Sequence, residues 1–202
     1  MKQATNKIKE RYNRISKIYN LMDYMIRSSW RKEMLRGLEG EVLEVGVGAG
    51  ANFEYYPMNI NVTGIDFSPK MLEIAQSKTQ KSKAEIKLIE MDIEQMEFPD
   101  NYFDTVISSC VFCSVPNPIA GLKEIRRVVK PEGKIIMLEH MRSENAFVGN
   151  ALDLVNPLTV RLTGANVNRE TVRNIEKSGM KIIHQQYLMT SIMRKLTISP
   201  NK

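Results

Sequence analysis

Three glycines alternate with small apolar residues in the stretch EVLEVGVGAGANF, as Gly46, Gly48 and Gly50. They follow a short apolar run typical of a buried strand, and a glycine-rich turn after a strand lets the backbone approach a nucleotide-like ligand closely. Gly46, Gly48 and Ala51 satisfy the spacing G-x-G-x-x-A, and Asp66 lies twenty residues after Gly46, where a nicotinamide site places its ribose-binding acid. The spacing therefore predicts a nucleotide-type ligand, with a dinucleotide as one alternative.

The acidic residues favour a different ligand. Glu44 precedes Gly46 by two positions, where its carboxylate can meet a cationic amino group but would repel a pyrophosphate. Asp92 follows the third predicted strand and suits an adenine amino group. The chain contains no Tyr-x-x-x-Lys pattern and has no room for a second domain for hydride chemistry. We expect a ligand that carries a cation, a ribose and an adenine.

Two further groups of residues are candidates for chemistry. His140, with Glu139, follows the fifth predicted strand and is placed to orient an acceptor or to take a proton, and a structural hydrogen bond is the alternative. Cys110 and Cys113 form a C-x-x-C pattern, but a chain with two cysteines and two histidines lacks the ligands for a metal site. We interpret the cysteines as pocket lining and predict no metal.

Short β-rich runs alternate with helical patterns along most of the chain. The runs are residues 41–46, 61–66, 86–92, 103–109 and 133–140, and the helical patterns cover 68–78 and 117–130. This alternation is typical of parallel strands joined by right-handed crossovers, and so of a doubly wound α/β sheet. The carboxyl ends of such strands form the ligand-binding edge.

The last part of the chain departs from this alternation. A helix predicted over 168–178 is closed by Gly179, and the runs MKIIHQQYL and SIMRKLTIS after it are separated by little more than Met189 and Thr190. Strands so close in sequence cannot be parallel, so we predict an antiparallel hairpin. Residues 141–166 are the least regular part, and their apolar stretch 147–160 is expected to form a wall of the acceptor site.

Composition sets the broad class of the protein. A chain of 202 residues with 43% hydrophobic and 26% charged residues is typical of one soluble globular domain. No apolar run approaches the roughly 18 residues of a membrane span, and no secretory signal precedes the predicted domain. The low cysteine content favours a reducing, cytoplasmic compartment. The sequence leaves the oligomeric state open.

The positive charge is concentrated near the N-terminus. Residues 1–36 hold ten Lys and Arg against three acids, in a chain whose net charge is +6. Apolar residues at helical spacing predict an amphipathic helix over 6–26, and a second helix is expected from about Trp30, with Ser28 or Ser29 as N-cap, to the region 37–40. We expect residues 1–38 to form a helical lid over a domain of residues 39–202. Its basic face is either solvated or in reversible contact with an anionic membrane surface, and a basic arm alone does not indicate nucleic acid.

The ordered motifs resemble those of class I S-adenosylmethionine-dependent methyltransferases over essentially the whole chain. They are VLEVGVGAG, VTGIDFSP, MDIEQMEFPD, FDTVISS and LKEIRRVVKPEGKIIMLEH. The resemblance implies a Rossmann-like sheet of seven strands in the order 3-2-1-4-5-7-6, with strand 7 antiparallel, and S-adenosylmethionine as the cofactor. The implied roles are Glu44 and Gly46 near the methionine moiety, Gly48 and Gly50 against the ligand by their backbone, Asp66 on the ribose, Phe67 beside the adenine, Asp92 with Ile93 at the adenine edge, and Ser109 or Cys110 near the sulfonium.

Other segments resemble particular groups within this family. RYNRISKIYNLMD is similar to the Tyr-Asp-x-x-Ala-x-x-Tyr-Asp opening of quinone-biosynthesis and phosphatidylethanolamine methyltransferases, whose tyrosines cover the cofactor. Tyr12 and Tyr19 match, whereas Asn13 and Asn20 replace the acids. GANFEYYP, VFCSV, LEHM and NPLTVRLTGANVNRET resemble segments of the membrane-associated alkyl-thiol methyltransferases of animals.

The resemblance implies methyl transfer to a small apolar or lipid-like nucleophile, with a thiol favoured. A phosphatidylethanolamine amine or a quinone precursor is the alternative acceptor, and His140, Tyr12 and Tyr19 are the candidate catalytic residues. SSCVFCSV after the fourth strand lacks the Asn-Pro-Pro-Tyr motif of base-modifying methyltransferases, so no nucleic-acid substrate is expected. A cofactor-binding or membrane-surface protein without catalytic activity, and a small nicotinamide-dependent oxidoreductase, are the alternatives from other classes.

Overall fold

The computed structural model describes residues 26–202, and these are built around one seven-stranded sheet. Its strand order is β3-β2-β1-β4-β5-β7-β6. β7 runs antiparallel to both neighbours, and the other pairs are parallel, which confirms the predicted topology and hairpin. The strands are β1 (Glu41–Val45), β2 (Asn61–Asp66), β3 (Glu85–Glu90), β4 (Phe103–Ser109), β5 (Val129–His140), β6 (Lys181–Met189) and β7 (Met193–Ser199).

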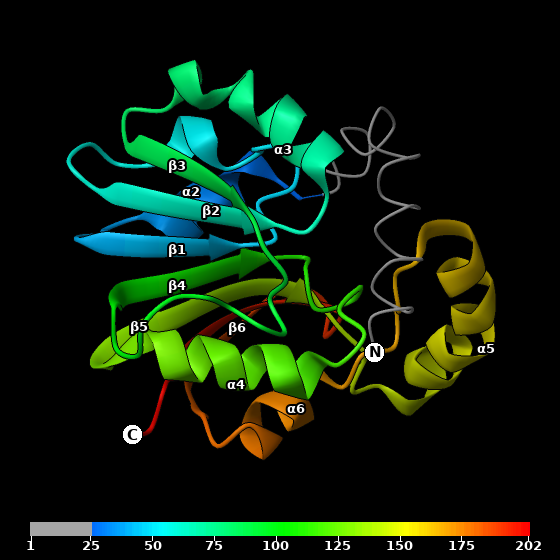
Figure 1. The fold of residues 1–202 in the computed structure, drawn as a ribbon. Coiled ribbons are helices and arrows are strands. Elements are labelled where there is room, and N and C mark those ends of the chain that lie inside the picture. The colour runs from blue at the N-terminus through cyan, green and yellow to red at the C-terminus, as the bar shows by residue number, and fades with distance from the viewer. Residues whose placement is uncertain (1–25) are drawn as a thin grey trace.

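Helices cover both faces of this sheet. α4 and α6 pack against each other on one face, whereas α2 lies on the opposite face and contacts β5 (Figure 1). α3 packs along β2 and β3. The helices are α2 (Ser28–Leu35), α3 (Pro69–Gln76), α4 (Pro118–Val128), α5 (Ala146–Thr163) and α6 (Thr171–Lys177), with 3-10 turns η1 (Phe53–Tyr55) and η2 (Thr79–Lys81).

The central strands are buried on both sides. Neighbouring residues Val42 and Leu43 of β1 belong to different hydrophobic clusters, because successive side chains of a strand point to opposite faces of the sheet. Both side chains are fully buried, as are Val106 and Ile107 of β4. The carboxyl ends of β1 and β4 are therefore firmly held, which fixes the loops that follow them.

The expectation that residues 141–166 are the least regular part is wrong, because an 18-residue helix, α5, occupies most of them. The Asn145 side chain accepts hydrogen bonds from the backbone N–H groups of Phe147 and Val148, which caps the first turn. Gly164 closes the last turn at φ +82°. The helix also holds Pro157, the residue that most disfavoured a helix in the sequence.

The start of the described chain partly matches the prediction. α2 begins at Ser28, but its N-cap is Arg27, which makes no side-chain capping bond, so the assignment of the cap to Ser28 or Ser29 is wrong. The expected helix over 6–26, including Tyr12 and Tyr19, lies outside the described residues apart from the buried Ile26. Among residues 26–202, no helix combines the length and the apolar character needed to cross a bilayer.

Candidate functional site

The glycine-rich turn follows β1 in a left-handed backbone conformation. Gly46 and Gly48 have φ values of +63° and +54°, which residues with a Cβ rarely adopt. A Cβ on Gly46 would lie 2.6 Å from a methyl carbon of Val111, so this position also lets the loop after β4 approach. Gly50 has a different role, because its Cβ would meet the Phe53 ring at 2.6 Å.

A cavity lies beyond the carboxyl ends of β1, β2, β3 and β4. Most of its lining is apolar, and the Asp66 and Asp92 side chains provide its acidic groups. Such an apolar slot with a few polar groups is typical of a small-molecule site. The lining residues are Gly46, Gly48, Ile65, Asp66, Phe67, Met71, Met91, Asp92, Ile93, Cys110, Val111, Ser114, Val115 and Pro116.

Asp66 links the glycine turn to the end of β2. Its carboxylate accepts hydrogen bonds from the backbone N–H of Gly48 at 2.9 Å and from that of Ser68 at 2.8 Å. Burial raises the pKa of this carboxyl to about 6, although the backbone donors oppose the shift. A buried carboxylate at the cavity edge is placed to accept further hydrogen bonds from ligand hydroxyls.

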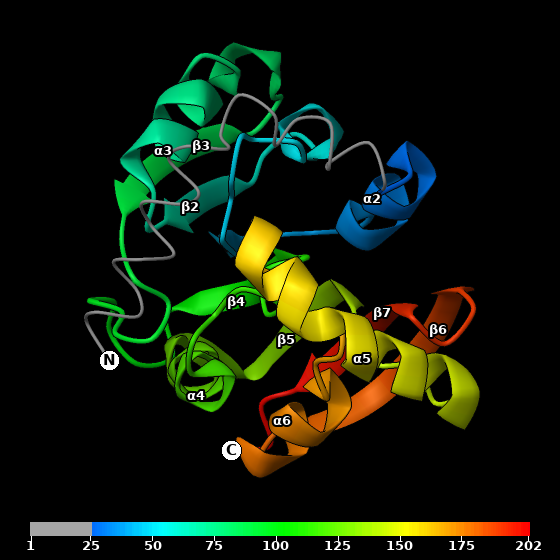
Figure 2. The same cartoon turned by 90° about the vertical axis from the view of Figure 1, so that its right-hand side faces the viewer.

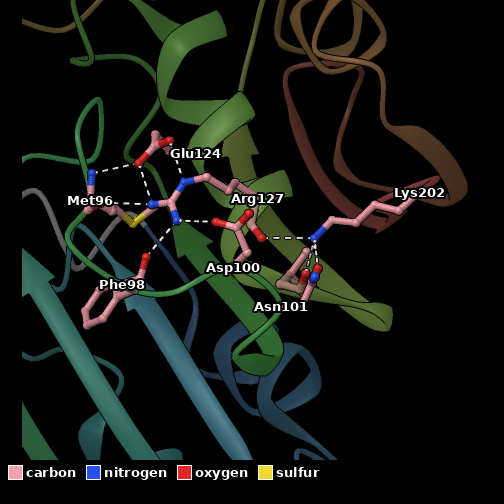
Figure 3. Close-up of polar contacts among 8 residues, drawn as sticks. Met96, Phe98, Asp100, Asn101, Glu124, Arg127 and Lys202 are labelled. Atoms are coloured by element: carbon pink, nitrogen blue, oxygen red, sulfur yellow. Dashed lines mark hydrogen bonds and ion pairs between the residues drawn. The ribbon is translucent and has the colours of Figure 1, made fainter.

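The loop after β3 carries Asp92 and Ile93 into the same cavity. Asp92 accepts a hydrogen bond from the backbone N–H of Glu94 at 2.9 Å, and Glu94 in turn accepts one from the N–H of Asn117 at 2.7 Å. Further along, Arg127 of α4 binds the loop through several contacts (Figure 3). The loop is therefore tied to α4 at two points.

A second, smaller cavity shares Gly46 and Gly48 with the first. Its other lining residues are polar or small: Arg31, Glu44, Val47, Ala51, Asn52 and Ser109. The Asn52 side-chain amide donates to the Glu44 carboxylate at 2.6 Å and to the Ser109 hydroxyl at 3.2 Å. The Arg31 guanidinium donates to the side-chain amide oxygen of Asn52 at 2.7 Å. Glu44 also accepts a hydrogen bond from the Tyr56 hydroxyl. The two cavities thus meet at the glycine turn, one apolar and one charged.

The chain leaves β4 through a strained turn. Cys110 adopts φ +54°, in the left-handed region. The buried Glu139 carboxylate holds this turn by accepting bonds from the Ser108 hydroxyl at 2.9 Å and from the N–H groups of Val111 at 3.0 Å and Phe112 at 3.3 Å. Of the two alternatives left open for Glu139, the structure shows the structural hydrogen bond, because its carboxylate accepts bonds from Ser108 and from the loop after β4.

The two cysteines differ in position. Cys110 lines the first cavity, whereas Cys113 is buried and its Sγ donates to the carbonyl oxygen of Cys110 at 3.3 Å. Burial raises the pKa of Cys113 to about 12 and that of Cys110 well above its usual value. Both side chains are thus neutral thiols near pH 7, which are poor nucleophiles.

His140 ends β5 next to this turn. Burial lowers the pKa of its imidazole, although the neighbouring Glu139 carboxylate opposes the shift. The side chain is therefore neutral near pH 7 and able to accept a proton. His140 is not among the lining residues of either cavity. The other histidine, His184, is exposed on β6.

The structure brings most of the predicted site residues together. Those that line the first cavity are Gly46, Gly48, Asp66, Phe67, Asp92, Ile93 and Cys110, and those that line the second are Glu44, Gly46, Gly48 and Ser109. Gly50 lines neither cavity, which departs from the expected ligand contact. Tyr12 and Tyr19 fall outside the described residues.

Sequence reasoning missed the partners of Glu44. Arg31 was placed only on the basic arm, and Asn52 and Tyr56 were noted only within the segment GANFEYYP. All three side chains are buried around Glu44 in the structure. The available signal was that a buried carboxylate requires donors, and GANFEYYP supplies two of them eight and twelve positions after Glu44.

Comparisons with known proteins find similarity to methyltransferases. Residues 43–137 match the sequence profile of a family described as "Methyltransferase domain". The chain is 39% identical over 103 residues to a phosphatidylethanolamine N-methyltransferase of Cereibacter sphaeroides, covering 50% of this chain and 51% of that protein. It is 30% identical over 162 residues to a human thiol S-methyltransferase, covering 77% and 66% respectively. A demethylmenaquinone methyltransferase of Staphylococcus aureus is 34% identical over 140 residues, covering 65% and 56%.

Solved structures share the fold over nearly the whole chain. A SAM-dependent methyltransferase of Thermotoga maritima has a TM-score of 0.69 at 19% identity, covering 96% of this chain and 99% of that one. One from Methanosarcina mazei has a TM-score of 0.63 at 18% identity, covering 86% and 97%. By contrast, the aligned part of the chain spans only about half to two thirds of the length of the curated relatives above.

Proposed function

Because the chain belongs to the class I S-adenosylmethionine-dependent methyltransferases, we propose that it moves a methyl group from that cofactor to a small apolar or lipid-like nucleophile, with a thiol favoured. The observation that carries this proposal is the pair of cavities that meet at Gly46 and Gly48. The apolar cavity suits an adenosine and the charged one suits the zwitterionic end of an amino acid. S-adenosylmethionine joins these two groups through its sulfonium.

Each end of the cofactor would meet side chains of complementary chemistry in one of the two cavities. Asp66 would accept hydrogen bonds from the ribose hydroxyls, while Phe67 and Ile93 flank the adenine and Asp92 meets its amino group. In the second cavity Arg31 would bind the carboxylate, and Glu44 would favour the ammonium.

When bound, S-adenosylmethionine supplies a methyl group that its sulfonium already activates. The protein then has to align the nucleophile and exclude water, and little acid–base chemistry is required. Ser109 ends β4 and Cys110 follows it, where the two cavities approach each other, so these two residues would flank the reacting centre. The Glu139 carboxylate keeps this turn in place.

The acceptor determines whether a base is needed. A thiol with a pKa near 8.5 is a few per cent thiolate at neutral pH, whereas a phenol or an amine is mostly protonated. His140, neutral and next to Cys110, is the candidate base for those acceptors. Relatives named for a thiol, a phosphatidylethanolamine and a demethylmenaquinone support both classes of acceptor.

The proposal extends to the N-terminal region and to the location of the protein. We propose that residues 1–38 form a lid over a domain of residues 39–202, with Tyr12 and Tyr19 covering the cofactor. We also propose a cytoplasmic protein with reversible contact to an anionic membrane surface, which fits the ten basic residues in the first 36.

Two assays test the proposal. Calorimetry should detect binding of S-adenosylmethionine, or of its demethylated product, and no comparable binding of NAD(H). Labelled cofactor is then offered with a short alkyl thiol, a phenol and phosphatidylethanolamine vesicles. We expect thioether formation that rises with pH toward the pKa of the thiol and falls only modestly in His140→Ala. The exposed His184→Ala variant is the matched control.

Other outcomes of the acceptor assay identify the alternatives. Methylated phenol or lipid without thioether would contradict the thiol assignment, and that activity should then fall about 10²-fold in His140→Ala. Cofactor binding without any methylated acceptor would favour a protein that binds the cofactor without catalysis.

A further inference from the structure

α5 is attached to the rest of the molecule by its polar side. The Arg142 guanidinium binds the Asp153 carboxylate at 2.8 Å, and Gly149 is buried against the same guanidinium. The side-chain amide oxygen of Asn156 accepts a hydrogen bond from the backbone N–H of Val167 at 2.9 Å. Polar and small groups thus face the protein, which is the reverse of an ordinary surface helix.

The apolar side of α5 is exposed along its whole length. Phe147, Leu154, Leu158 and Leu162 have exposed fractions of 89%, 83%, 61% and 65%. Their spacing of seven and then four residues places them on one face, together with the exposed Val148 and Val155. We call these six residues the α5 stripe. Contiguous exposed apolar surface of this kind marks an interaction site.

The stripe lies beside the proposed active site. In Figure 2, which faces the carboxyl ends of the strands, α5 lies across the front of the sheet. The segment after α5 contacts the loop that follows β4, because Asn166 donates from its backbone N–H at 2.8 Å and from its side chain at 3.0 Å to the carbonyl oxygen of Cys113. A partner that contacts α5 from outside would therefore lie next to the cavity.

We propose that the α5 stripe is a docking surface for a lipid bilayer, into whose hydrocarbon boundary its six side chains enter. This inference rests on the proposed function, since an apolar acceptor dissolved in the bilayer would then meet the cavity directly. The stripe contains no charged residue, and its sixteen positions span about 24 Å, which suits a helix lying in the plane of the interface.

The charge distribution identifies the kind of bilayer. The first 36 residues carry ten basic against three acidic side chains and lead directly into α2, whose Arg31 lines the second cavity. Anionic lipid attracts such a segment, and stable but reversible attachment generally needs two signals. The α5 stripe supplies the apolar signal and the basic segment supplies the electrostatic one.

Vesicle binding of the full chain tests this inference without any need for catalysis. Flotation is measured with phosphatidylcholine vesicles, with and without phosphatidylglycerol. The test variant is the double substitution Phe147→Glu/Leu154→Glu, and the control is Ile183→Glu, which charges a side chain 60% exposed on β6. We expect the double variant to bind both vesicles at least tenfold more weakly than the wild type, and the control to bind like the wild type.

Further readouts separate this inference from the proposed function. Phe147 and Leu154 line neither cavity, contrary to the expected acceptor wall over 147–160. Cofactor affinity by calorimetry should therefore be the same in the wild type and the double variant, as should methylation of a soluble acceptor. Added salt should weaken binding to anionic vesicles and leave binding to neutral vesicles unchanged, because salt screens only the electrostatic signal.

Three results would overturn the inference. The first is equal vesicle binding by the wild type and the double variant, or none by either. The second is a wild-type dimer that the double variant converts to a monomer in sedimentation, which would make the stripe a contact between two copies. The third is a double substitution that lowers the melting temperature of the full chain but not that of a chain lacking residues 1–25. This result would mean that the N-terminal segment packs on the α5 stripe.

Discussion

Asp66 is buried at the edge of the apolar cavity and holds the N–H of Gly48. Its carboxylate has to be ionised to accept hydrogen bonds both from the backbone and from a ribose. Burial disfavours the charge, and the resulting pKa of about 6 lies close to physiological pH. The protonation state of this one group should therefore be visible in cofactor binding.

We predict that the affinity for S-adenosylhomocysteine falls as the pH falls through 6. A carboxyl with a pKa of about 6 is mostly ionised at pH 7 and mostly protonated at pH 5, so binding should be about tenfold weaker at pH 5. Titration calorimetry at both pH values measures this. Asp66→Asn should bind weakly at both and lose the pH dependence. A dependence that survives in Asp66→Asn would point instead to Glu139, whose pKa is also raised to about 6 by burial.

Arg31 permits a second prediction at the residue scale. If its guanidinium binds the cofactor carboxylate, Arg31→Ala should weaken S-adenosylhomocysteine binding about 10- to 100-fold, the value of one or two charge-assisted hydrogen bonds. Binding of methylthioadenosine, which lacks that carboxylate, should change little. The exposed neighbour Lys32, whose ammonium lies 5.8 Å from the Tyr55 ring, provides the control Lys32→Ala. An equal loss for both ligands would show that Arg31 acts through the fold alone.

At the scale of elements, α4 holds the loop that carries Asp92 and Ile93. Arg127 donates to the carbonyl oxygens of Met96 at 2.8 Å and Phe98 at 2.6 Å, and to the Asp100 carboxylate at 2.8 Å (Figure 3). Glu124, one turn earlier, orients the guanidinium with two contacts at 2.9 Å. Both carboxylates raise the pKa of Arg127, so its charge is permanent.

Arg127 does not line either cavity, yet we expect Arg127→Lys to weaken cofactor binding several-fold. A lysine cannot reproduce the planar guanidinium that joins α4 to the loop. Free energy of unfolding should fall by about 1–3 kcal/mol as the carbonyl contacts are lost. The matched control is Arg126→Lys, since Arg126 contacts the carbonyl oxygens of Pro200 and Asn201 instead. Denaturation and calorimetry together check this. If Arg127→Lys is destabilised but its cofactor affinity is unchanged, the loop that carries Asp92 and Ile93 keeps its position without the Arg127 contacts.

At the scale of the whole molecule, the proposed lid and the sheet domain can be tested separately. Ile26 is buried in the core, so a chain beginning there retains its packing, and residues 26–202 contain the complete sheet. We predict that deleting residues 1–25 leaves the melting temperature nearly unchanged but lowers methyl transfer at least tenfold, since the proposed lid excludes water from the site. Circular dichroism and the acceptor assay measure the two effects. Normal turnover in the shortened chain would contradict the lid.

Local patterns in the sequence were sufficient to predict most of the sheet and much of its ligand-binding edge. Backbone hydrogen bonding and side-chain periodicity are local, so alternating runs predicted the parallel strands, and the short gap at Thr190 predicted the antiparallel hairpin. Because parallel strands end at a common edge, the acids at the ends of the second and third strands, Asp66 and Asp92, were predicted to meet one ligand, and they line one cavity. Gly46 and Gly48, predicted at the same edge, line both cavities.

Only the tertiary structure decided which side chains meet across the fold. Gly50 follows the same pattern as Gly48, yet it packs against Phe53, because the direction of the chain after the turn depends on the 3-10 turn that replaces a full helix there. For Glu139 the sequence left two alternatives, an acceptor contact and a structural hydrogen bond, and the structure shows that the loop after β4 returns to Glu139 and binds both oxygens. Whether a side chain serves a ligand or the fold depends on contacts between residues distant in sequence, and no local periodicity encodes these.

The same distinction applies to α5. Its apolar residues are visible in the sequence, and burial is the expected destination of an apolar stripe. The structure places the stripe outside because Asp153 and Asn156, on the other side of the helix, are bound by Arg142 and Val167. The sequence thus showed the apolar residues of this segment but not the helix, and only the tertiary structure showed that they share one side of α5 and that this side faces away from the protein.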